Sequence, residues 1–180
     1  MIGCYYTHQV IDDLFDSDFA QSLGSALETT YSQQDETYAV FTQEEYQLTD
    51  KIKLIGGLRY EDDKRALGNF SLLGVVLPGA PPATFIPGVA QSIDDRRLSG
   101  KGEIEYKPNE NVMLYASVSE GIKSGGFTTY NASQSAPSLK PEVLWAYEAG
   151  VKSNLMDDTL QLNGSVFWYH YENQQIQSAG

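Results

Sequence analysis

The sequence has little of what enzymes and nucleic-acid-binding proteins commonly use to build their sites. Cys4 is the only cysteine among 180 residues, so the chain can form neither an intrachain disulfide nor a metal cluster held by cysteine thiolates. Lysine and arginine number 12 against 24 aspartates and glutamates, which gives a formal charge of −12. Because a phosphate backbone is bound by clustered basic side chains, this balance excludes nucleic acid as a partner.

Long apolar runs are missing as well. No stretch of about 18 consecutive apolar residues occurs, which excludes a transmembrane helix. The start of the chain, MIGCYYTHQV, lacks the basic, apolar and small-residue segments of a secretory signal peptide. The mean hydropathy is slightly polar, but this average does not separate soluble chains from membrane barrels, whose strands alternate lipid-facing and lumen-facing residues.

Aromatic residues, in contrast, make up 12% of the chain, and most glycines and prolines fall between apolar stretches. This distribution favours an all-β fold. Short turns and long stretches alternate along the chain, the long ones at 12–34, 66–94 and 124–141. The alternation predicts an antiparallel meander of strands joined in hairpins. The seven expected strands are residues 3–11, 37–48, 52–65, 97–107, 111–123, 142–153 and 159–173.

The expected strands are long enough to cross a bilayer. Strands in soluble sheets usually have about 5 or 6 residues, whereas a tilted transmembrane strand needs about 9 to 11. Within 52–65, Leu54 and Leu58 fall on one face of the strand, and Lys53 and Arg59 fall on the other. One face suits lipid and the other suits water, which predicts part of a large, incomplete transmembrane β-barrel. Short turns are then periplasmic and long loops extracellular.

Two features of the pattern leave alternatives open. Phe41 and Phe167 fall out of phase with their apolar neighbours, so the facing of their two strands is undecided. Aromatic residues near both strand ends fit two interfacial girdles, but they also fit the general preference of Tyr and Trp for strands. The residues concerned are Tyr46, Tyr106 and Tyr115 near the short turns, and Tyr60, Trp168 and Tyr169 toward the far ends.

Three stretches of the chain resemble the barrel of TonB-dependent receptors of the bacterial outer membrane. They are YAVFTQEEYQLTDKIKLIGGLRYEDDKR, GEIEYKPNENVMLYASVSEGIKSGGF and LKPEVLWAYEAGVKSNLMDDTLQLNGSVFWYHYENQQIQ. The most specific pieces are LYASVSEGIKSGGF, from Leu114 to Phe127, and LKPEVLWAYEAGVKS, from Leu139 to Ser153. The resemblance covers nearly all of residues 36–180, and residues 1–35 more loosely.

The resemblance implies a barrel of about 22 strands with a plugged lumen, and transport driven by the periplasmic protein TonB. Such receptors import iron–siderophore complexes, cobalamin or other scarce nutrients. Residues 1–180 are expected to be an internal part of such a barrel, with the plug domain and the TonB-contacting segment absent. The implied partners are outer-membrane lipid and lipopolysaccharide, a nutrient chelate, and TonB acting through the plug.

No pattern typical of an enzyme occurs in the sequence. His8 and His170 are far apart and have no second ligand at metal-binding spacing. Neighbouring acidic residues such as Asp62 and Asp63 point to opposite faces of a strand, so they do not form a general acid and base across one cleft. No nucleophile elbow is present. We therefore expect no enzymatic activity, no catalytic residues, no bound metal and no cofactor.

Contacts with a ligand are expected at loop tips and on the upper lumen wall, because binding residues concentrate on loops held by a rigid scaffold. Tyr31 in the first long stretch, and Phe127 and Tyr130 in the third, are the aromatic candidates. Arg59 and Lys123 are candidates for attracting an anionic ferric complex. The alternatives are ordinary loop packing for the aromatic residues and pairing with nearby glutamates for the two cations.

Three functions compete at this stage. The first is part of a TonB-coupled receptor that imports a siderophore-type iron complex or another scarce nutrient. The second is a passive, porin-like or structural segment of an outer-membrane barrel, which an upstream plug domain would exclude. The third is a soluble β-rich binding module, which would need shorter strands around one wholly apolar face.

Overall fold

The computed structural model describes residues 1–19, 25–76, 84–87, 90–128, 138–157 and 159–176. All regular structure within these residues is β-strand, which confirms the expected all-β class. No helix in these ranges is long and apolar enough to cross a membrane. The strands are β1 (Ile2–Phe19), β2 (Ser25–Thr49), β3 (Ile52–Val76), β4 (Thr84–Pro87), β5 (Gln91–Asn109), β6 (Val112–Lys123), β7 (Gly126–Phe127), β8 (Ser138–Leu139), β9 (Glu142–Leu155) and β10 (Leu160–Glu172).

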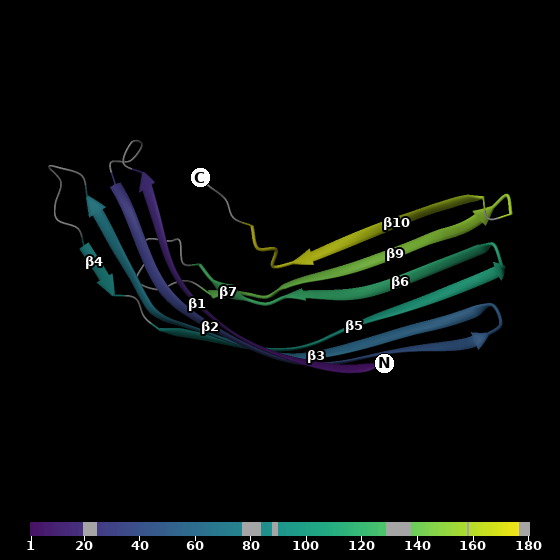
Figure 1. The fold of residues 1–180 in the computed structure, drawn as a ribbon, viewed down its shortest axis with the longest axis horizontal. Helices are drawn as coiled ribbons and strands as arrows, with labels where there is room; N and C mark the ends of the chain where they lie inside the picture. The colour runs from purple at the N-terminus through teal and green to yellow at the C-terminus, as the bar shows by residue number, and fades with distance from the viewer. Residues whose placement is uncertain (20–24, 77–83, 88–89, 129–137, 158, 177–180) are drawn as a thin grey trace.

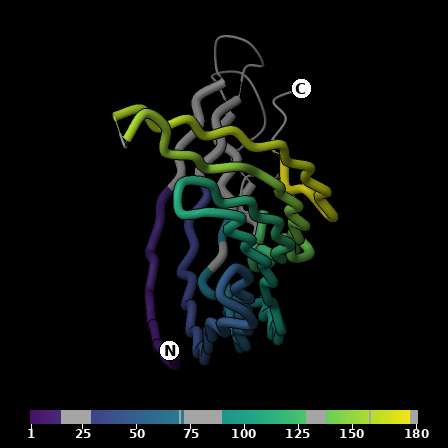
Figure 2. The backbone as a smooth tube through the Cα atoms, turned by 90° about the vertical axis from the view of Figure 1, so that its right-hand side faces the viewer, coloured from purple at the N-terminus to yellow at the C-terminus, as the bar shows by residue number. Residues whose placement is uncertain are grey.

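One curved, open sheet contains all the long strands (Figure 1). Its order is β1-β2-β3-β5-β6-β9-β10, with β4 added beside β3, and all the pairings are antiparallel. The seven strands on this path match the meander predicted from the sequence. The short turns lie together at one end of the sheet (Figure 1), while the view along the sheet shows its two edges standing apart (Figure 2).

The short turns are held by residue types that favour turns. Thr49 Oγ1 accepts hydrogen bonds from the backbone N–H groups of Lys51 and Ile52 at 3.2 and 3.1 Å. Asn109 Oδ1 accepts from the N–H group of Asn111 at 3.0 Å. Side chains that bond their own turn in this way pre-form the hairpin. The turn between β9 and β10 instead has left-handed φ angles of 54° at Met156 and 53° at Asp157.

The strands are longer, and the connections shorter, than the sequence pattern predicted. β1 continues to Phe19 and β2 begins at Ser25, so most of the stretch 12–34 is paired strand. β3 and β5 likewise pair as far as Leu67 and Gln91, inside the stretch predicted as a loop. Because the ladder is made by the backbone, polar side chains do not prevent pairing where a strand projects into water. Pro87 lies at the end of the short strand β4, where a missing N–H group is tolerated.

The two faces of the sheet differ sharply in chemistry. We call the face covered by β7 and β8 the inner face and the opposite one the outer face. Leu54 and Leu58 lie on the outer face, and Lys53 and Arg59 lie on the inner face, as predicted from the alternation. The exposed apolar residues of the outer face include Val40, Leu58, Tyr60, Leu98, Ile104, Leu114, Val118, Tyr147 and Val151.

The aromatic residues that break the pattern belong to the inner face. The ring of Phe41 fills the space beside Gly3, where an added Cβ would lie 2.4 Å from the Phe41 Cζ. Phe167 stacks on Tyr169 with ring centroids 4.9 Å apart. Tyr115 donates a hydrogen bond to Glu148 on the same face. Tyr115 and Tyr169 are therefore not part of a lipid-facing girdle, whereas the other four predicted residues lie on the outer face.

The apolar character of the outer face stops abruptly along the strands. The change falls between two neighbouring rows of residues that pair across β2, β3 and β5. The last apolar row is Val40, Tyr60 and Leu98, and the next row is Tyr38, Asp62 and Arg96. Arg96 Nε forms an ion pair with Asp62 Oδ2 at 3.1 Å. Charged side chains favour water over lipid, so this change marks the end of the membrane-facing band.

Candidate functional site: the inner face of the sheet

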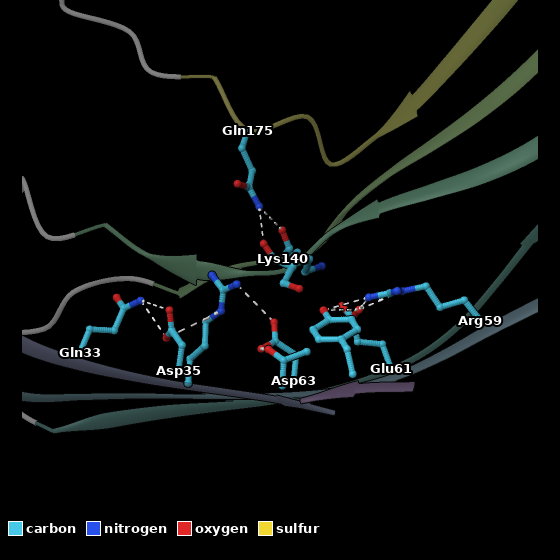
Figure 3. A network of polar contacts seen from close by, with 11 residues as sticks. Gln33, Asp35, Arg59, Glu61, Asp63, Lys140 and Gln175 are labelled. Carbon is cyan, nitrogen blue, oxygen red and sulfur yellow. Dashed lines mark hydrogen bonds and ion pairs between the residues drawn. The ribbon is translucent and has the colours of Figure 1, made fainter. Parts of the chain in front are cut away.

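The inner face carries a line of polar side chains that bond one another along β3 and its neighbours. Near the middle of the sheet, Arg59 Nε donates to Glu61 Oε2 at 3.0 Å, and Arg59 Nη2 forms an ion pair with the same carboxylate. Arg59 Nη2 also donates to the hydroxyl of Tyr5 at 2.9 Å, and the guanidinium lies 4.9 Å from the centre of that ring. Figure 3 shows Arg59 and Glu61 in this group. The cation is therefore neutralised locally and held in place by two strands.

A second group lies farther from the short turns and surrounds Arg65. Figure 3 labels three of its members, Gln33, Asp35 and Asp63. Arg65 Nη2 forms an ion pair with Asp63 Oδ2 at 3.2 Å, and Arg65 Nε lies 4.0 Å from Asp35 Oδ1. Thr37 Oγ1 donates to Asp63 Oδ1 at 2.8 Å, and Gln33 Nε2 donates to both carboxylate oxygens of Asp35. Asp63 is only 4% exposed. A buried carboxylate needs such partners, because an unpaired charge out of water is costly.

An apolar contact on this face is centred on Leu67, which is 1% exposed. Tyr31 from β2 and Phe127 from β7 pack against it. Tyr31 also donates a hydrogen bond from its hydroxyl to Asp13 Oδ2 at 3.0 Å. The contact joins residues that are far apart in sequence, and it places the strand pair β7–β8 against the inner face of β2 and β3.

The chain after β10 secures the base of the same strand pair. Gln175 Nε2 donates to the backbone oxygens of Lys140 at 3.0 Å and Ser124 at 3.4 Å, and the Gln175 N–H group donates to Glu142 Oε2 at 2.9 Å. Figure 3 shows Gln175 reaching Lys140 above the sheet. The segments on both sides of β7–β8 are thus tied to one anchor.

The structure places the five predicted ligand contacts in different surroundings. Tyr31 and Phe127 come together on Leu67, and Arg59 is held by Glu61. Lys123 lies at the end of β6, and within the described residues it has no hydrogen bond or ion pair. Tyr130 lies outside the described residues. Their role in ligand binding remains a prediction.

Sequence reasoning did not select Asp63, Arg65 and Leu67 as site residues. Asp63 and Arg65 are central to the polar group around Arg65, and Leu67 is the centre of the apolar contact with Tyr31 and Phe127. Asp63 and Arg65 lie at the end of the predicted strand 52–65, where Asp63 was considered only as one of two neighbouring acidic residues on opposite faces, and Leu67 lies in the stretch predicted to be a loop. The alternation continues from Arg59 through Glu61, Asp63 and Arg65 to Leu67 without a break. Following that period from Arg59 to residue 67 would have placed all three on the inner face.

On the outer face beyond the apolar band, Glu36 accepts hydrogen bonds from two tyrosines. Tyr38 donates at 2.9 Å and Tyr6 at 3.1 Å, both to Oε1, and the two rings lie 4.7 Å apart. These hydrogen bonds, first that from Tyr38 and then that from Tyr6, lower the pKa of Glu36 below its usual value. No group of three or more metal-ligating side chains occurs in the part of the chain that the structure describes.

Comparison with known proteins agrees with this geometry. A family model described as TonB dependent receptor-like, beta-barrel matches residues 2–180. The chain is similar to the ferric yersiniabactin uptake receptor FyuA from Yersinia pestis, with 22% identity and a TM-score of 0.74 over 98% of this chain. It is also similar to the ferric-catecholate import receptor Fiu from E. coli K12, with 14% identity and a TM-score of 0.61 over 96% of this chain.

A third similar structure is the copper transporter OprC, with 16% identity and a TM-score of 0.58 over 92% of this chain. This chain covers 26% of the FyuA structure, 32% of the Fiu structure and 29% of the OprC structure. It therefore spans between a quarter and a third of the length of these three proteins. At these identities the likeness shows a shared fold, which is the wall of a β-barrel.

Proposed function

The chain belongs to the family of TonB-dependent receptor-like β-barrels, and from this premise we propose that it forms part of the wall of a receptor for active nutrient import. Proteins of this family are transporters rather than enzymes, and they lie in the bacterial outer membrane. The expected resemblance and the barrel fold are thereby confirmed. The import activity itself is our proposal.

The observation that carries the proposal is the opposite chemistry of the two faces. The outer face exposes apolar side chains over the band that ends at Tyr60 and Leu98. The inner face at the same height carries charged, hydrogen-bonded side chains such as Arg59 and Glu61. A sheet of this kind is stable when lipid covers one side and a polar lumen lies on the other. A soluble module would leave the apolar face in water.

We further propose that the cargo is a siderophore-type iron complex or another scarce nutrient chelate. FyuA and Fiu are receptors for ferric complexes, and OprC is a copper transporter. Tyr31, Phe127 and Tyr130 are the proposed aromatic contacts, and Arg59 and Lys123 are the proposed cationic ones. TonB would act through a plug domain that is not part of residues 1–180, and the outer face would contact lipid and lipopolysaccharide.

Uptake measurements test this function and separate it from a passive channel. A strain in which the gene for this chain is deleted is compared with its parent and with a complemented strain for uptake of radioactive iron supplied as a panel of siderophores. We expect uptake of one ferric complex to be lost on deletion, to return on complementation, and to be lost again when TonB is removed. Uptake that depends on the gene but not on TonB would favour a passive barrel. No dependence on the gene for any chelate would contradict import.

A further inference from the structure

A hollow of about 660 Å³ lies on the outer face of β9 and β10. Five side chains line it, Trp145 and Tyr147 from β9, and Trp168, His170 and Glu172 from β10. Trp168 pairs with Tyr147, and His170 pairs with Trp145, so the lining residues of the two strands project from one face. The size of the hollow falls within the range of small-molecule sites. We call this hollow the aromatic slot.

The aromatic slot lies where the membrane-facing part of β10 ends, at the end away from its short turn (Figure 1). From Leu160 to Trp168 the strand rises by about 26 Å, which is about 20 Å upright at a tilt of about 40°. At Glu172 the upright height reaches about 30 Å. Because the apolar band of an outer-membrane barrel is about 25 Å tall, Trp168 lies at the rim of the band and Glu172 lies among the lipid headgroups.

The aromatic slot is open toward the membrane. Trp168 is 72% exposed and Tyr147 is 49% exposed. In a complete barrel the next strand would pair along the edge of β10, about 4.8 Å away, and so beside the sheet rather than over its outer face. Lipid is therefore the neighbour that these rings meet.

The aromatic slot also carries negative charge without a permanent cation to balance it. Glu172 Oε1 lies 3.9 Å from His170 Nε2, which forms an ion pair only when the imidazole is protonated. Glu120, which pairs with a slot residue of β9 in the ladder, places a second carboxylate on the outer face. The strands β6, β9 and β10 contain no arginine, and their two lysines lie on the inner face, Lys123 and Lys152.

We propose that the aromatic slot binds the ammonium group of a lipid headgroup, while the acyl chains of that lipid lie along the apolar outer face of the β9–β10 hairpin. Ammonium groups are attracted to the faces of Trp and Tyr rings, and cages of such rings bind quaternary ammonium ligands. Glu172 supplies the opposite charge at the depth of the headgroups. Below Trp168, the exposed side chains of Val166 and Leu162 continue the same face and contact the chains.

A soluble amine would reach the rings and the carboxylate but would gain nothing from Val166 and Leu162, which is why we assign the aromatic slot to a lipid. The site rests on the part of the proposed function that places the outer face in lipid. It does not depend on nutrient import.

Quenching of tryptophan fluorescence by lipids with brominated chains measures the preference for a headgroup. Trp145 and Trp168 are the only tryptophans of residues 1–180, so subtracting the signal of a receptor with Trp145→Phe and Trp168→Phe isolates the aromatic slot. The complete receptor is placed in phosphatidylglycerol vesicles that contain a small share of one brominated lipid. The brominated lipids are phosphatidylethanolamine, phosphatidylcholine, phosphatidylglycerol and an uncharged glucosyl diacylglycerol.

We expect the two ammonium lipids to quench the aromatic slot several-fold more than the uncharged lipid at the same share. The uncharged lipid separates attraction of the ammonium from repulsion of anionic phosphatidylglycerol by Glu172. Glu172→Gln should remove most of the preference and leave quenching by the uncharged lipid unchanged. Trp168→Leu, which keeps an apolar side chain but lacks the ring, should weaken the preference read from Trp145. Glu110→Gln, the same loss of charge in the turn between β5 and β6, should behave like the parent.

Equal quenching by all headgroups, or an unchanged preference in Glu172→Gln, would overturn the site. Tetramethylammonium chloride is added separately, with sodium chloride at equal ionic strength as its control. A fluorescence change specific to tetramethylammonium, without any preference among lipids, would assign the aromatic slot to a soluble amine and overturn the lipid. Each variant is first checked for the heat-dependent gel shift of a folded barrel.

The same measurement separates failure of the site from failure of the proposed function. If every brominated lipid quenches the aromatic slot equally, the outer face lies in lipid and only the site is refuted. If no brominated lipid quenches it, the outer face does not meet the membrane, and the proposed role as a barrel wall falls together with the site.

Discussion

Asp63 shows how single residues keep the inner wall polar without exposing it. Its carboxylate is 4% exposed, accepts a hydrogen bond from Thr37 and forms an ion pair with Arg65. Arg65 in turn lies within 4.0 Å of Asp35. The group joins β2 to β3 through side chains, in addition to the backbone ladder between them.

Replacing Asp63 by Ala should therefore destabilise the barrel. The substitution leaves Arg65 and Thr37 with a lost partner in a poorly hydrated place, which typically costs about 1–3 kcal/mol. The free energy of unfolding in urea, measured on the complete barrel in vesicles, checks this value. Asp94→Ala is the matched control, since that carboxylate is 53% exposed and its ion pair with Arg96 should contribute less than about 1 kcal/mol. Equal effects of the two substitutions would contradict the role given to burial.

At the scale of elements, the strand pair β7–β8 is too short for its own hydrogen bonds to hold it on the inner face. Two residues in each strand cannot hold a ladder by themselves. Its stability comes from Phe127 on Leu67 and from Gln175 at its base. The pair is thus an attachment to the inner face, and it depends on contacts made by distant parts of the chain.

Gly125 is the residue at which this attachment should be most sensitive. A Cβ there would lie 2.5 Å from the backbone oxygen of Leu139, closer than real contacts allow. Gly125→Val should release β7–β8 and increase trypsin cleavage after Lys123, which precedes the pair, by several-fold. Gly102→Val is the control, because an added Cβ there has no neighbour within 4 Å. Unchanged cleavage in Gly125→Val would show that the strand pair is not held in this way.

At the scale of the whole molecule, the difference between the two faces predicts which side chains meet water. Leu58 and Arg59 are neighbours on β3, yet they point to opposite faces. In the complete barrel in vesicles, with Cys4 replaced by Ser, Arg59→Cys should react with a water-soluble maleimide and Leu58→Cys should not. Equal labelling of the two positions would contradict the assignment of lumen and lipid faces.

The same difference predicts how residues 1–180 behave alone in water. Large apolar side chains such as Leu98, which is 62% exposed, would face solvent, and the outward edges of β1 and β10 have no strand partner among the described residues. Apolar patches and open edges both promote association. We expect the isolated chain to aggregate without detergent and to need detergent for solubility. A single monomer peak in size-exclusion chromatography in plain buffer would refute this.

Much of the fold was predictable because the signals that specify it are local. The alternation around Leu58 and Arg59 has a period of two, and it placed the lipid and lumen faces correctly without knowledge of any neighbour. The turns at Thr49 and Asn109 were located from the residue types that close hairpins. The strand ends were not predictable in this way, because polar residues beyond Tyr60 form a ladder only when the adjacent strand also continues.

By itself, the sequence determined the all-β class, the seven-strand meander, its two faces and its resemblance to an outer-membrane receptor. These follow from alternation, turn chemistry and local motifs, which neighbouring residues specify. Only the tertiary structure decided that Tyr31 and Phe127 meet on Leu67 and that Arg65 lies between two aspartates. Each of these depends on which distant strands lie side by side, and on how the charges and rings of those strands fit together once they do.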